Sequence, residues 1–383
     1  MIKRNWFYGI ILIWLVLFVG SICIFQYVKN RPNIVLWMED FHPSVAYEKG
    51  KEALKQGRIG RAVEFFQKGQ AYFKQLFKES ELARHKELWA YGLLLEANAY
   101  KDSASLKQKK QSIPLYRQVI ELAPTLSNGQ PCVSLGEMYQ ELGDYENAVE
   151  AYTLAMDFSS AEYALPPYFG RGYCYKYLNV PAKAAEDWYI YIRFHQQAMR
   201  EWMLQEMLSL NGADSGKALY IEGYARMKLK ENKEEAIERF KHFLKENPSN
   251  RSAEYYLSLL TGAEYKPNYG EIPLSEMFPP NGPGQRNLGE IFIDLYTSVS
   301  GDFIFQSKFE TIEGIRLPVQ IHIFIWGGPK ASWLVDQKGA IVEKERISMR
   351  KGRNILRVNI NKTYNEKNYN QIRLTSIKWA KYQ

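Results

Sequence analysis

The histidines are the residues best suited to chemistry in this sequence, and they are scattered without a catalytic or metal-binding spacing. They are His42, His85, His195, His242 and His322. None falls in the HExxH pattern, in which two imidazoles face one metal ion from adjacent helical turns. No serine lies in the GxSxG turn that exposes a nucleophile above a sheet. We therefore interpret each histidine as structural or solvent-exposed, and we predict no metal site.

Residues 211–218, NGADSGKA, come closest to a phosphate-binding loop. Such a loop needs a glycine where Asn211 stands, and a magnesium-binding serine or threonine where Ala218 stands. It also joins a strand to a helix, whereas this segment joins two helical stretches. Paired carboxylates for glycoside hydrolysis need only meet in space, and nothing in the sequence supports them. We expect a chain that is not an enzyme and that holds no cofactor.

The element that organises the chain lies between residues 131 and 161, where small residues recur among aromatic and aliphatic ones. The positions are Gly136, Tyr139, Leu142, Gly143, Ala148, Tyr152 and Ala155. Small residues let two antiparallel helices approach closely, and the larger ones fill the space beside them. The segment resembles a tetratricopeptide repeat, which is a pair of short helices joined by a tight turn. One such pair cannot bury its apolar faces alone, so the sequence predicts neighbouring copies.

Copies of this pattern lie on both sides, three of them clear and a fourth degenerate. The resemblance to the tetratricopeptide repeat family covers residues 44–262 and implies an all-α solenoid, closed by a helix at 252–260. Two stretches depart from the pattern: a basic insertion that lengthens a turn at 101–112, and an extra helical stretch at 195–210. Insertions often lie on the binding face, although tolerated surface variation explains them equally well.

The family resemblance also implies a groove lined by the first helix of each repeat. Carried over position by position, the groove residues are Tyr47, Lys51 and Lys55, then Val133, Glu137, Gln140 and Glu141, and then Phe169, Tyr173, Lys176 and Tyr177. Aromatic and charged side chains together suit an extended or helical peptide, through apolar pockets and charge-assisted hydrogen bonds. The alternative is that Tyr173 and Tyr177 pack against the adjacent repeat.

Residues 6–27 run without a formal charge and are long enough to span the ~30 Å hydrocarbon core of a bilayer. A cleaved signal peptide is the alternative, but its apolar core is shorter and a small-residue cleavage site would follow. We interpret residues 1–31 as a single membrane anchor. Lys3, Arg4 and the terminal amine precede the span, which favours a cytoplasmic N-terminus. The bulk of the chain would then be extracytoplasmic, or periplasmic in a cell with two membranes.

The charge balance favours an acidic partner. The 383 residues carry a formal net charge of +8, which suits anionic lipid, an acidic polysaccharide or an acidic protein. Nucleic acid is not expected, because lysine and arginine alternate with glutamate along the repeats. Three cysteines do not make a disulfide framework, and Cys132 and Cys174 are expected to pack as small apolar residues.

The composition and the apolar period of the sequence change after the repeats. Residues 263–288 are rich in proline and glycine, which predicts a linker or an ordered crossing segment. From 289 to 383 the apolar period is about two, with strands expected at 289–299, 302–311, 317–326, 332–336, 340–349, 354–360 and 371–382. This predicts an antiparallel β-sandwich, faintly like jelly-roll or immunoglobulin-like modules, with a hairpin joining 332–336 to 340–343.

Tryptophans in this β domain suggest a second kind of ligand, a carbohydrate. An exposed Trp333 would stack on a sugar ring, whereas strand tryptophans, including Trp326 and Trp379, are commonly core residues. Our main interpretation is a membrane-anchored adaptor that contacts one or more proteins and stabilises an envelope complex. The alternative is an accessory protein of polysaccharide synthesis or export, whose β domain binds glycan.

Overall fold

A computed structural model describes most of the chain between Pro43 and Tyr382. The described residues are 43–158, 161–195, 199–210, 216–267, 270–272, 277–278, 290–311, 319–325, 328–335, 340–361 and 372–382. The chain divides into two compact units, Met1–Ala123 and Pro124–Gln383, and each is considered by itself. The predicted membrane anchor at residues 1–31 lies outside the described residues. Among the helices of the described ranges, none has the length and apolar character needed to cross a bilayer.

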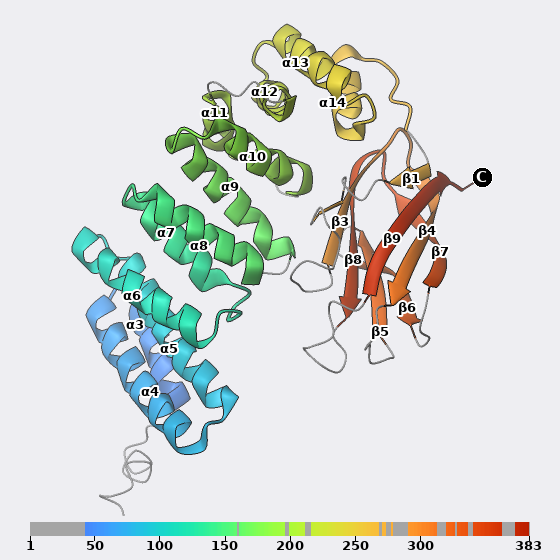
Figure 1. Cartoon of the computed structure of the whole chain (residues 1–383). Helices are drawn as coiled ribbons and strands as arrows, with labels where there is room; N and C mark the ends of the chain where they lie inside the picture. The colour runs from blue at the N-terminus through green and yellow to red at the C-terminus, as the bar shows by residue number, and fades with distance from the viewer. Residues whose placement is uncertain are drawn as a thin grey trace, which may run out of the picture. The chain divides into compact units, whose positions relative to one another are not determined.

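The N-terminal unit consists of helices that pack in chain order (Figure 1). They are α3 (Pro43–Lys55), α4 (Ile59–Ser80), α5 (Ala83–Lys101) and α6 (Leu106–Leu122). Because α6 begins at Leu106, most of the 101–112 insertion is helical, and the turn that we expected it to lengthen is short. The added residues extend a repeat helix, since the lysines and glutamines that fill them have good helix propensity.

The C-terminal unit continues the helix pairs. Its helices are α7 (Gln130–Glu141), α8 (Tyr145–Phe158), α9 (Ala161–Tyr177), α10 (Pro181–Phe194), α11 (Glu201–Leu208), α12 (Gly216–Leu229), α13 (Lys233–Glu246) and α14 (Arg251–Thr261). The extra helical stretch expected within 195–210 is α11, and the expected closing helix is α14. The tight turns also follow the sequence, since Gly57 and Gly143 take φ of +70° and +76° between paired helices.

A glycine facing an aromatic ring recurs in four of the helix pairs. The pairs are Gly50 with Phe66, Gly136 with Tyr152, Gly172 with Trp188, and Gly223 with Phe240. A Cβ placed on Gly136 would lie 2.7 Å from the Tyr152 ring, and one on Gly50 would lie 2.3 Å from the Phe66 ring. Real Cβ atoms do not approach that closely, so the glycines are what lets these helices meet.

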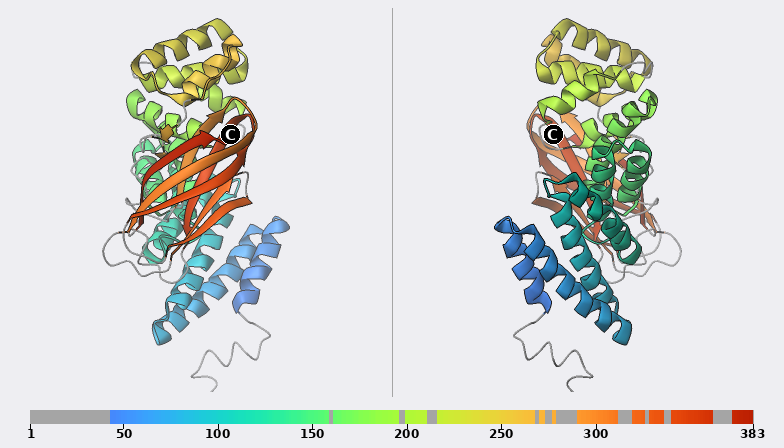
Figure 2. Two further views of the ribbon diagram at one scale, coloured as in Figure 1. Left: turned by 90° about the vertical axis from the view of Figure 1, so that its right-hand side faces the viewer. Right: turned by 90° about the vertical axis from the view of Figure 1, so that its left-hand side faces the viewer.

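Two antiparallel sheets follow the helices. Their strands are β1 (Gly270–Ile272), β2 (Met277–Phe278), β3 (Glu290–Thr297), β4 (Gly301–Thr311), β5 (Val319–Ile325), β6 (Gly328–Val335), β7 (Ala340–Met349), β8 (Gly352–Asn361) and β9 (Ile372–Lys381). One sheet has the order β1-β9-β4-β7, and the other has the order β2-β3-β8-β5-β6. Their strands, orange to red in Figure 2, twist relative to one another as antiparallel strands do.

The expected hairpin between residues 332–336 and 340–343 is wrong. These segments are the end of β6 and the start of β7, but β6 pairs with β5 in one sheet while β7 pairs with β4 in the other. The chain therefore passes from one sheet to the other between β6 and β7. The proline-rich stretch at 263–288 contributes β1 and β2 at described positions, so part of it is an ordered crossing segment.

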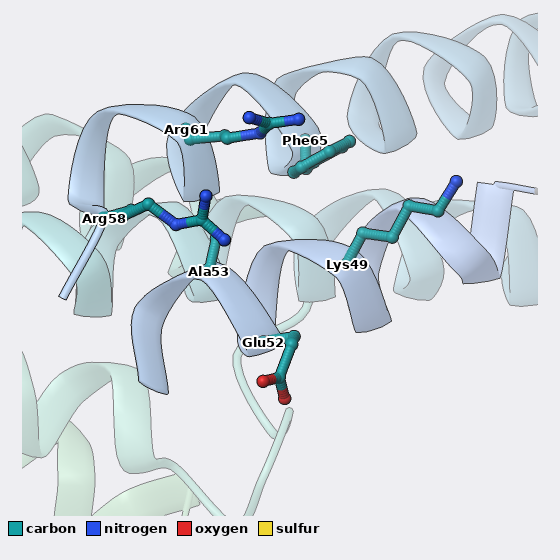
Figure 3. A pocket seen from close by; sticks show the side chains of 6 residues that line it. All are labelled: Lys49, Glu52, Ala53, Arg58, Arg61 and Phe65. Atoms are coloured by element: carbon teal, nitrogen blue, oxygen red, sulfur yellow. The ribbon is translucent and has the colours of Figure 1, made fainter. Parts of the chain in front are cut away.

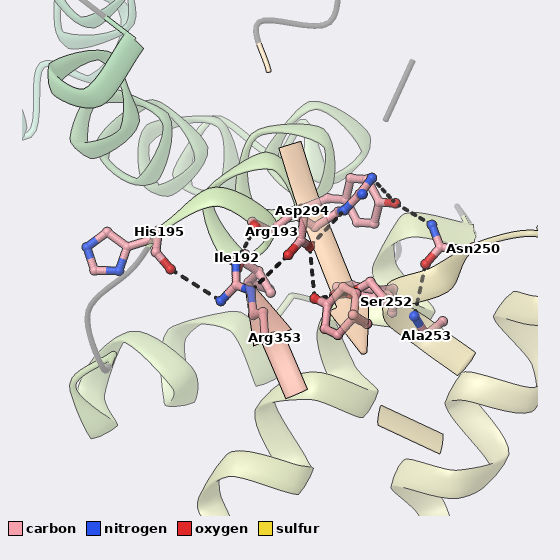
Figure 4. A network of polar contacts seen from close by, with 11 residues as sticks. Ile192, Arg193, His195, Asn250, Ser252, Ala253, Asp294 and Arg353 are labelled. Carbon is pink, nitrogen blue, oxygen red and sulfur yellow. Dashed lines mark hydrogen bonds and ion pairs between the residues drawn. The ribbon is translucent and has the colours of Figure 1, made fainter. Parts of the chain in front are cut away.

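The sheets join the helices of the same unit through a buried polar network around Asp294 on β3 (Figure 4). Arg353 on β8 donates from Nε to Asp294 Oδ1 at 3.0 Å. Its other nitrogens donate to the carbonyl oxygens of Ile192 at 3.2 Å and His195 at 3.4 Å, in and just after the last turn of α10. Arg193 lies 3.6 Å from the same carboxylate. Arg353 thus caps a helix C-terminus, where carbonyls lack partners and a positive charge is favourable.

A second contact ties α14 to the same strand. Ser252 is hydrogen-bonded to the Tyr296 hydroxyl at 2.9 Å, and that hydroxyl donates to Asp294 Oδ2 at 2.8 Å. The Tyr255 and Tyr296 rings lie 4.7 Å apart between centroids, and Tyr296 is fully buried. Buried polar groups with partners in good geometry favour one arrangement over slipped alternatives. The later helices of this unit and strand β3 therefore share one core.

Candidate functional site

Tyr47, the first residue implied for the groove, lies in the core of the N-terminal unit. It is 3% exposed, and its hydroxyl donates to the carbonyl of Leu88 at 2.9 Å. The ring fills gaps left by Gly69 on α4 and Gly92 on α5, where a Cβ would lie 2.3 and 2.2 Å from the tyrosine. Burial raises the pKa of Tyr47. We therefore exclude Tyr47 from the candidate surface.

Lys51 and Lys55 lie on α3 of the same unit and reach solvent. Lys51 pairs with Glu48 at 2.7 Å and lies over the Tyr91 ring at 5.4 Å. The hydrogen bond to Glu48 raises the pKa of Lys51. Lys55 pairs with Glu52 at 3.6 Å, and its side chain is 77% exposed. Both are pairs between neighbouring turns of one helix, which contribute little to stability and leave the ammonium groups accessible.

In α7, the implied groove residues divide between surface and core. Glu137 and Glu141 are exposed, whereas Val133 is buried. Gln140 is half-buried and accepts a hydrogen bond from the Tyr152 hydroxyl at 2.9 Å. Gln140 therefore holds the second helix of its own repeat, and the two glutamates give this part of the surface a negative charge.

Phe169 on α9 is covered by α11, the helix that interrupts the repeat pattern. It is 8% exposed and packs at 5.4 Å, edge to face, against Trp202 on α11. Trp202 itself is 50% exposed. Met203, Leu204 and Met207 bury the opposite side of α11. An amphipathic inserted helix thus lies on part of the α9 face that the resemblance assigns to the groove.

Three tyrosines gather at the end of α9. The Tyr173 and Tyr177 rings lie 4.6 Å apart between centroids, and Tyr177 stacks on Tyr145 of α8 at 5.1 Å and 19°. Tyr177 is 46% exposed. Burial and the neighbouring Tyr177 raise the pKa of Tyr173, so its hydroxyl stays protonated at neutral pH. Tyr177 thus packs on Tyr145 of the adjacent repeat, as the alternative expected, and about half of the residue stays exposed.

Lys176 joins this cluster to α11. Its Nζ lies 2.6 Å from Glu206 and 2.5 Å from the hydroxyl of Ser209, and it also lies over the Tyr177 ring at 5.1 Å. We call the whole patch the α9–α11 surface. It consists of Tyr145, Phe169, Tyr173, Lys176, Tyr177, Trp202 and Glu206.

The contacts fix how α11 runs. Phe169 meets Trp202, and seven residues later Lys176 meets Glu206, so α11 follows α9 in the same direction. The sequence implied the α9 residues through the family resemblance but did not single out Tyr145, Trp202 or Glu206 by residue. The inserted stretch at 195–210 was the signal for the last two, because insertions in repeat proteins often lie on the binding face.

The remaining candidates add no site. Trp333 lies on β6, and its side chain falls outside the described residues. Trp379 is 2% exposed and packs at 5.7 Å against Phe303, so it is a core residue. Of NGADSGKA, residues 211–215 lie outside the described ranges, and α12 begins at the glycine that follows them. Across the part of the chain that the structure covers, no group of three or more acidic, histidine or cysteine side chains is arranged for a metal ion.

Comparison with known proteins supports the helical assignment. A tetratricopeptide repeat family model matches residues 130–161, which contain α7 and α8. A search of curated proteins finds no significant match. Among solved structures, a tetratricopeptide repeat protein from Parabacteroides merdae is 16% identical, over 58% of this chain and 74% of that chain, with a TM-score of 0.32.

Two other solved structures resemble parts of the chain. YrrB, described as a TPR protein with an unusual peptide-binding site, is 14% identical, over 58% of this chain and 94% of its own, with a TM-score of 0.31. The sugar-binding C-terminal domain of EclA is 14% identical, over 30% of this chain and 70% of its own, with a TM-score of 0.21. At these scores the likenesses carry no argument about a ligand.

The matched pair α7–α8 shares its turn geometry and its glycine-to-aromatic contact with the helix pairs around it. Such repeats present one face of each helix pair to other proteins. Residues 130–161 of this chain therefore match the tetratricopeptide repeat family, whose repeats in general mediate contacts between proteins, and the neighbouring helix pairs have the same close glycine-to-aromatic contact.

Proposed function

We propose that this chain is a membrane-anchored adaptor that binds a protein partner at the α9–α11 surface. The observation that carries the proposal is the exposure of two large aromatic residues, Tyr177 and Trp202, on the two helices that the Lys176–Glu206 pair joins. Exposed aromatic residues are enriched at protein interfaces, because they bury a large area while ordering few torsions.

The chemistry of this surface suits a peptide segment with apolar anchors. The rings at Tyr177 and Trp202 offer apolar contact, and Tyr173 packs against the Tyr177 ring at 4.6 Å. Glu206 adds a carboxylate that can accept a hydrogen bond from a basic or amide side chain. The partner we propose is an extended or helical segment with aromatic or aliphatic residues and at least one donor.

The inserted helix α11 distinguishes this surface from an ordinary repeat groove. It covers Phe169, engages Lys176, and adds Trp202 and Glu206. A partner therefore meets a composite of α9 and α11 rather than α9 alone. Since Lys176 and Glu206 are both only partly exposed, the pair also holds α11 in place before a partner arrives.

Membrane anchoring is the second part of the proposal, and its support comes from the sequence. The uncharged residues 6–27 are long enough to span a bilayer, and Lys3 and Arg4 precede them. The repeats and sheets would then be held on the extracytoplasmic side, as a subunit of an envelope complex. The role requires no reaction and no cofactor.

The test is purification of the full-length protein from its native membranes in mild detergent, followed by quantitative identification of what remains bound. Tyr177→Ala with Trp202→Ala should reduce the retained partner about tenfold or more, as expected when two interface aromatics are lost. Leu82→Ala with Leu106→Ala is the matched control, since both leucines are more than half exposed on the N-terminal unit. Equal losses in both variants, or none in either, would contradict the assignment.

A further inference from the structure

A basic pocket between α3 and α4 of the N-terminal unit is not used by the proposed adaptor surface. Its volume is about 290 Å³, and its lining is Lys49, Glu52, Ala53, Arg58, Arg61 and Phe65 (Figure 3). Three of these six side chains are cationic. Phe65 forms an apolar wall, and Arg61 lies over its ring at 5.8 Å.

The cations of this pocket have no anionic partner among the described residues. Arg58 donates to the side-chain oxygen of Gln56, which is neutral. The one carboxylate of the pocket, Glu52, is engaged by Lys55 at 3.6 Å and by Gln56 at 3.0 Å. Figure 3 shows it pointing away from the two guanidinium groups. An anion entering the pocket would therefore meet unneutralised charge.

Helix stability does not explain the two arginines. Arg58 is the N-cap residue of α4 and forms no side-chain cap, and the first turn contains Arg61 but no acidic residue. Positive charge at a helix N-terminus is unfavourable, because the macrodipole already places partial positive charge there. A ligand anion would remove this cost, which makes binding a better reason for the arginines than folding.

The net charge of the whole protein is concentrated in the unit that holds this pocket. Residues 1–123 contain 19 lysines and arginines against 11 aspartates and glutamates, a net charge of +8. Residues 124–383 contain 31 of each and are formally neutral. An acidic partner of this chain is therefore expected at the N-terminal unit.

We propose that this pocket binds the phosphate group of an anionic phospholipid in the membrane that holds the N-terminal segment. The inference rests on the proposed membrane anchoring. Fifteen residues separate the apolar stretch 6–27 from α3, a reach of at most about 50 Å, so the pocket would stay close to the bilayer surface. Tethering raises the local concentration of headgroups, and arginine pairs bind phosphate in bidentate geometry.

The test places the full-length chain in nanodiscs of phosphatidylcholine, with or without phosphatidylglycerol, and follows amide hydrogen exchange. Peptides spanning residues 49–65 should exchange about threefold more slowly with phosphatidylglycerol, the factor for a site that is two-thirds occupied. The protection should weaken at high salt. Arg58→Glu with Arg61→Glu should abolish it without lowering Tm, because acidic residues suit a helix N-terminus.

Lys107→Glu with Lys110→Glu is the matched control. It changes the net charge equally at exposed positions of α6 in the same unit, and it should keep the protection. Equal exchange in the two lipids, or protection that survives Arg58→Glu with Arg61→Glu, would overturn the proposal. Protection by a free glutamate-rich peptide in phosphatidylcholine, without protection by phosphatidylglycerol, would instead assign the pocket to an acidic protein.

Failure of the anchor gives a different result. A chain that does not enter nanodiscs refutes the membrane span, and the same exchange measurement with added phosphatidylglycerol vesicles then tests the pocket by itself. Protection of residues 49–65 by those vesicles would retain the lipid site without the anchor. The absence of this protection would refute the lipid site as well as the anchor.

Discussion

Replacing Arg353 by methionine tests whether the Asp294 network holds the sheets against the repeats. The change keeps much of the side-chain volume and removes the charge. It breaks the 3.0 Å bond to Asp294 and the bonds to the carbonyls of Ile192 and His195. Asp294 is fully buried and keeps Arg193 at 3.6 Å and Tyr296 at 2.8 Å.

The magnitude follows from these contacts. Removing one partner of a buried ion pair costs about 3–5 kcal/mol, and the remaining Arg193 places Arg353→Met near the lower end, at about 3 kcal/mol. Asp294→Asn removes the buried carboxylate that both guanidinium groups contact, so we expect a loss of about 5 kcal/mol. The double variant should cost at least about 1.5 kcal/mol less than the sum, because the two residues share one network.

Native-state hydrogen exchange is the suitable assay, because local free energies do not require a single two-state transition. The loss of local stability should appear in β8 and in the last turn of α10. The exchange of α5, in the other unit, should be unchanged. Arg346→Met is the matched control, since Arg346 is 58% exposed and pairs with Asp302 at 3.5 Å on the surface, a contact worth less than about 1 kcal/mol. If the free-energy losses of Arg353→Met and Arg346→Met differ by less than about 1 kcal/mol, the network does not hold β3 and β8 against α10.

Three further predictions follow from the packing. Gly69→Ala should destabilise the N-terminal unit by about 1–3 kcal/mol in urea unfolding, because its Cβ would lie 2.3 Å from the Tyr47 ring. Gly60→Ala in the same helix meets nothing within 4 Å and should stabilise by about 0.5–1 kcal/mol, so effects of the same sign would refute the packing. Burial raises the pKa of Cys132 and of Cys174 to about 12, and a raised pKa favours the unreactive thiol, so at pH 8 a thiol reagent should label neither until the chain unfolds. Lys176→Glu places two carboxylates together and should speed amide exchange in α11, whereas unchanged exchange would show that the pair with Glu206 does not hold that helix.

Local patterns in the sequence predicted the elements well. The alternation at 340–349 predicted β7 with the bounds that the structure gives, because one buried face repeats every second residue. Gly57 and Gly143 marked turns whose positive φ glycine adopts without strain. The burial expected for Cys132 and Cys174 is confirmed, since both are fully buried and free.

Contacts between distant residues were beyond such patterns. Tyr47 matches a groove position of the family, yet its side chain is buried, because it occupies the space that Gly69 and Gly92 leave by having no Cβ atom. The segments 332–336 and 340–343 look like a hairpin, because turn residues mark a reversal but do not say which strand will pair.

The candidate site was predictable only in part for the same reason. The family resemblance gave Lys176 and Tyr177, and the insertion at 195–210 pointed to a departure from the repeat. That Trp202 and Glu206 would come to lie on α9 depends on how α11 folds back, across 30 residues between Lys176 and Glu206. Helix amphipathicity orients α11 toward a core but does not choose its neighbour.

Site-specific photo-crosslinking in native membranes tests the central claim most directly. A photoreactive phenylalanine analogue placed at Tyr177 or at Trp202 should crosslink to one and the same protein, because both side chains are about half exposed on the α9–α11 surface. The same analogue at Lys241, whose side chain is 53% exposed on α13, should not capture that protein. Crosslinks of equal yield at Lys241, or different proteins captured at Tyr177 and Trp202, would contradict a defined partner site on this surface.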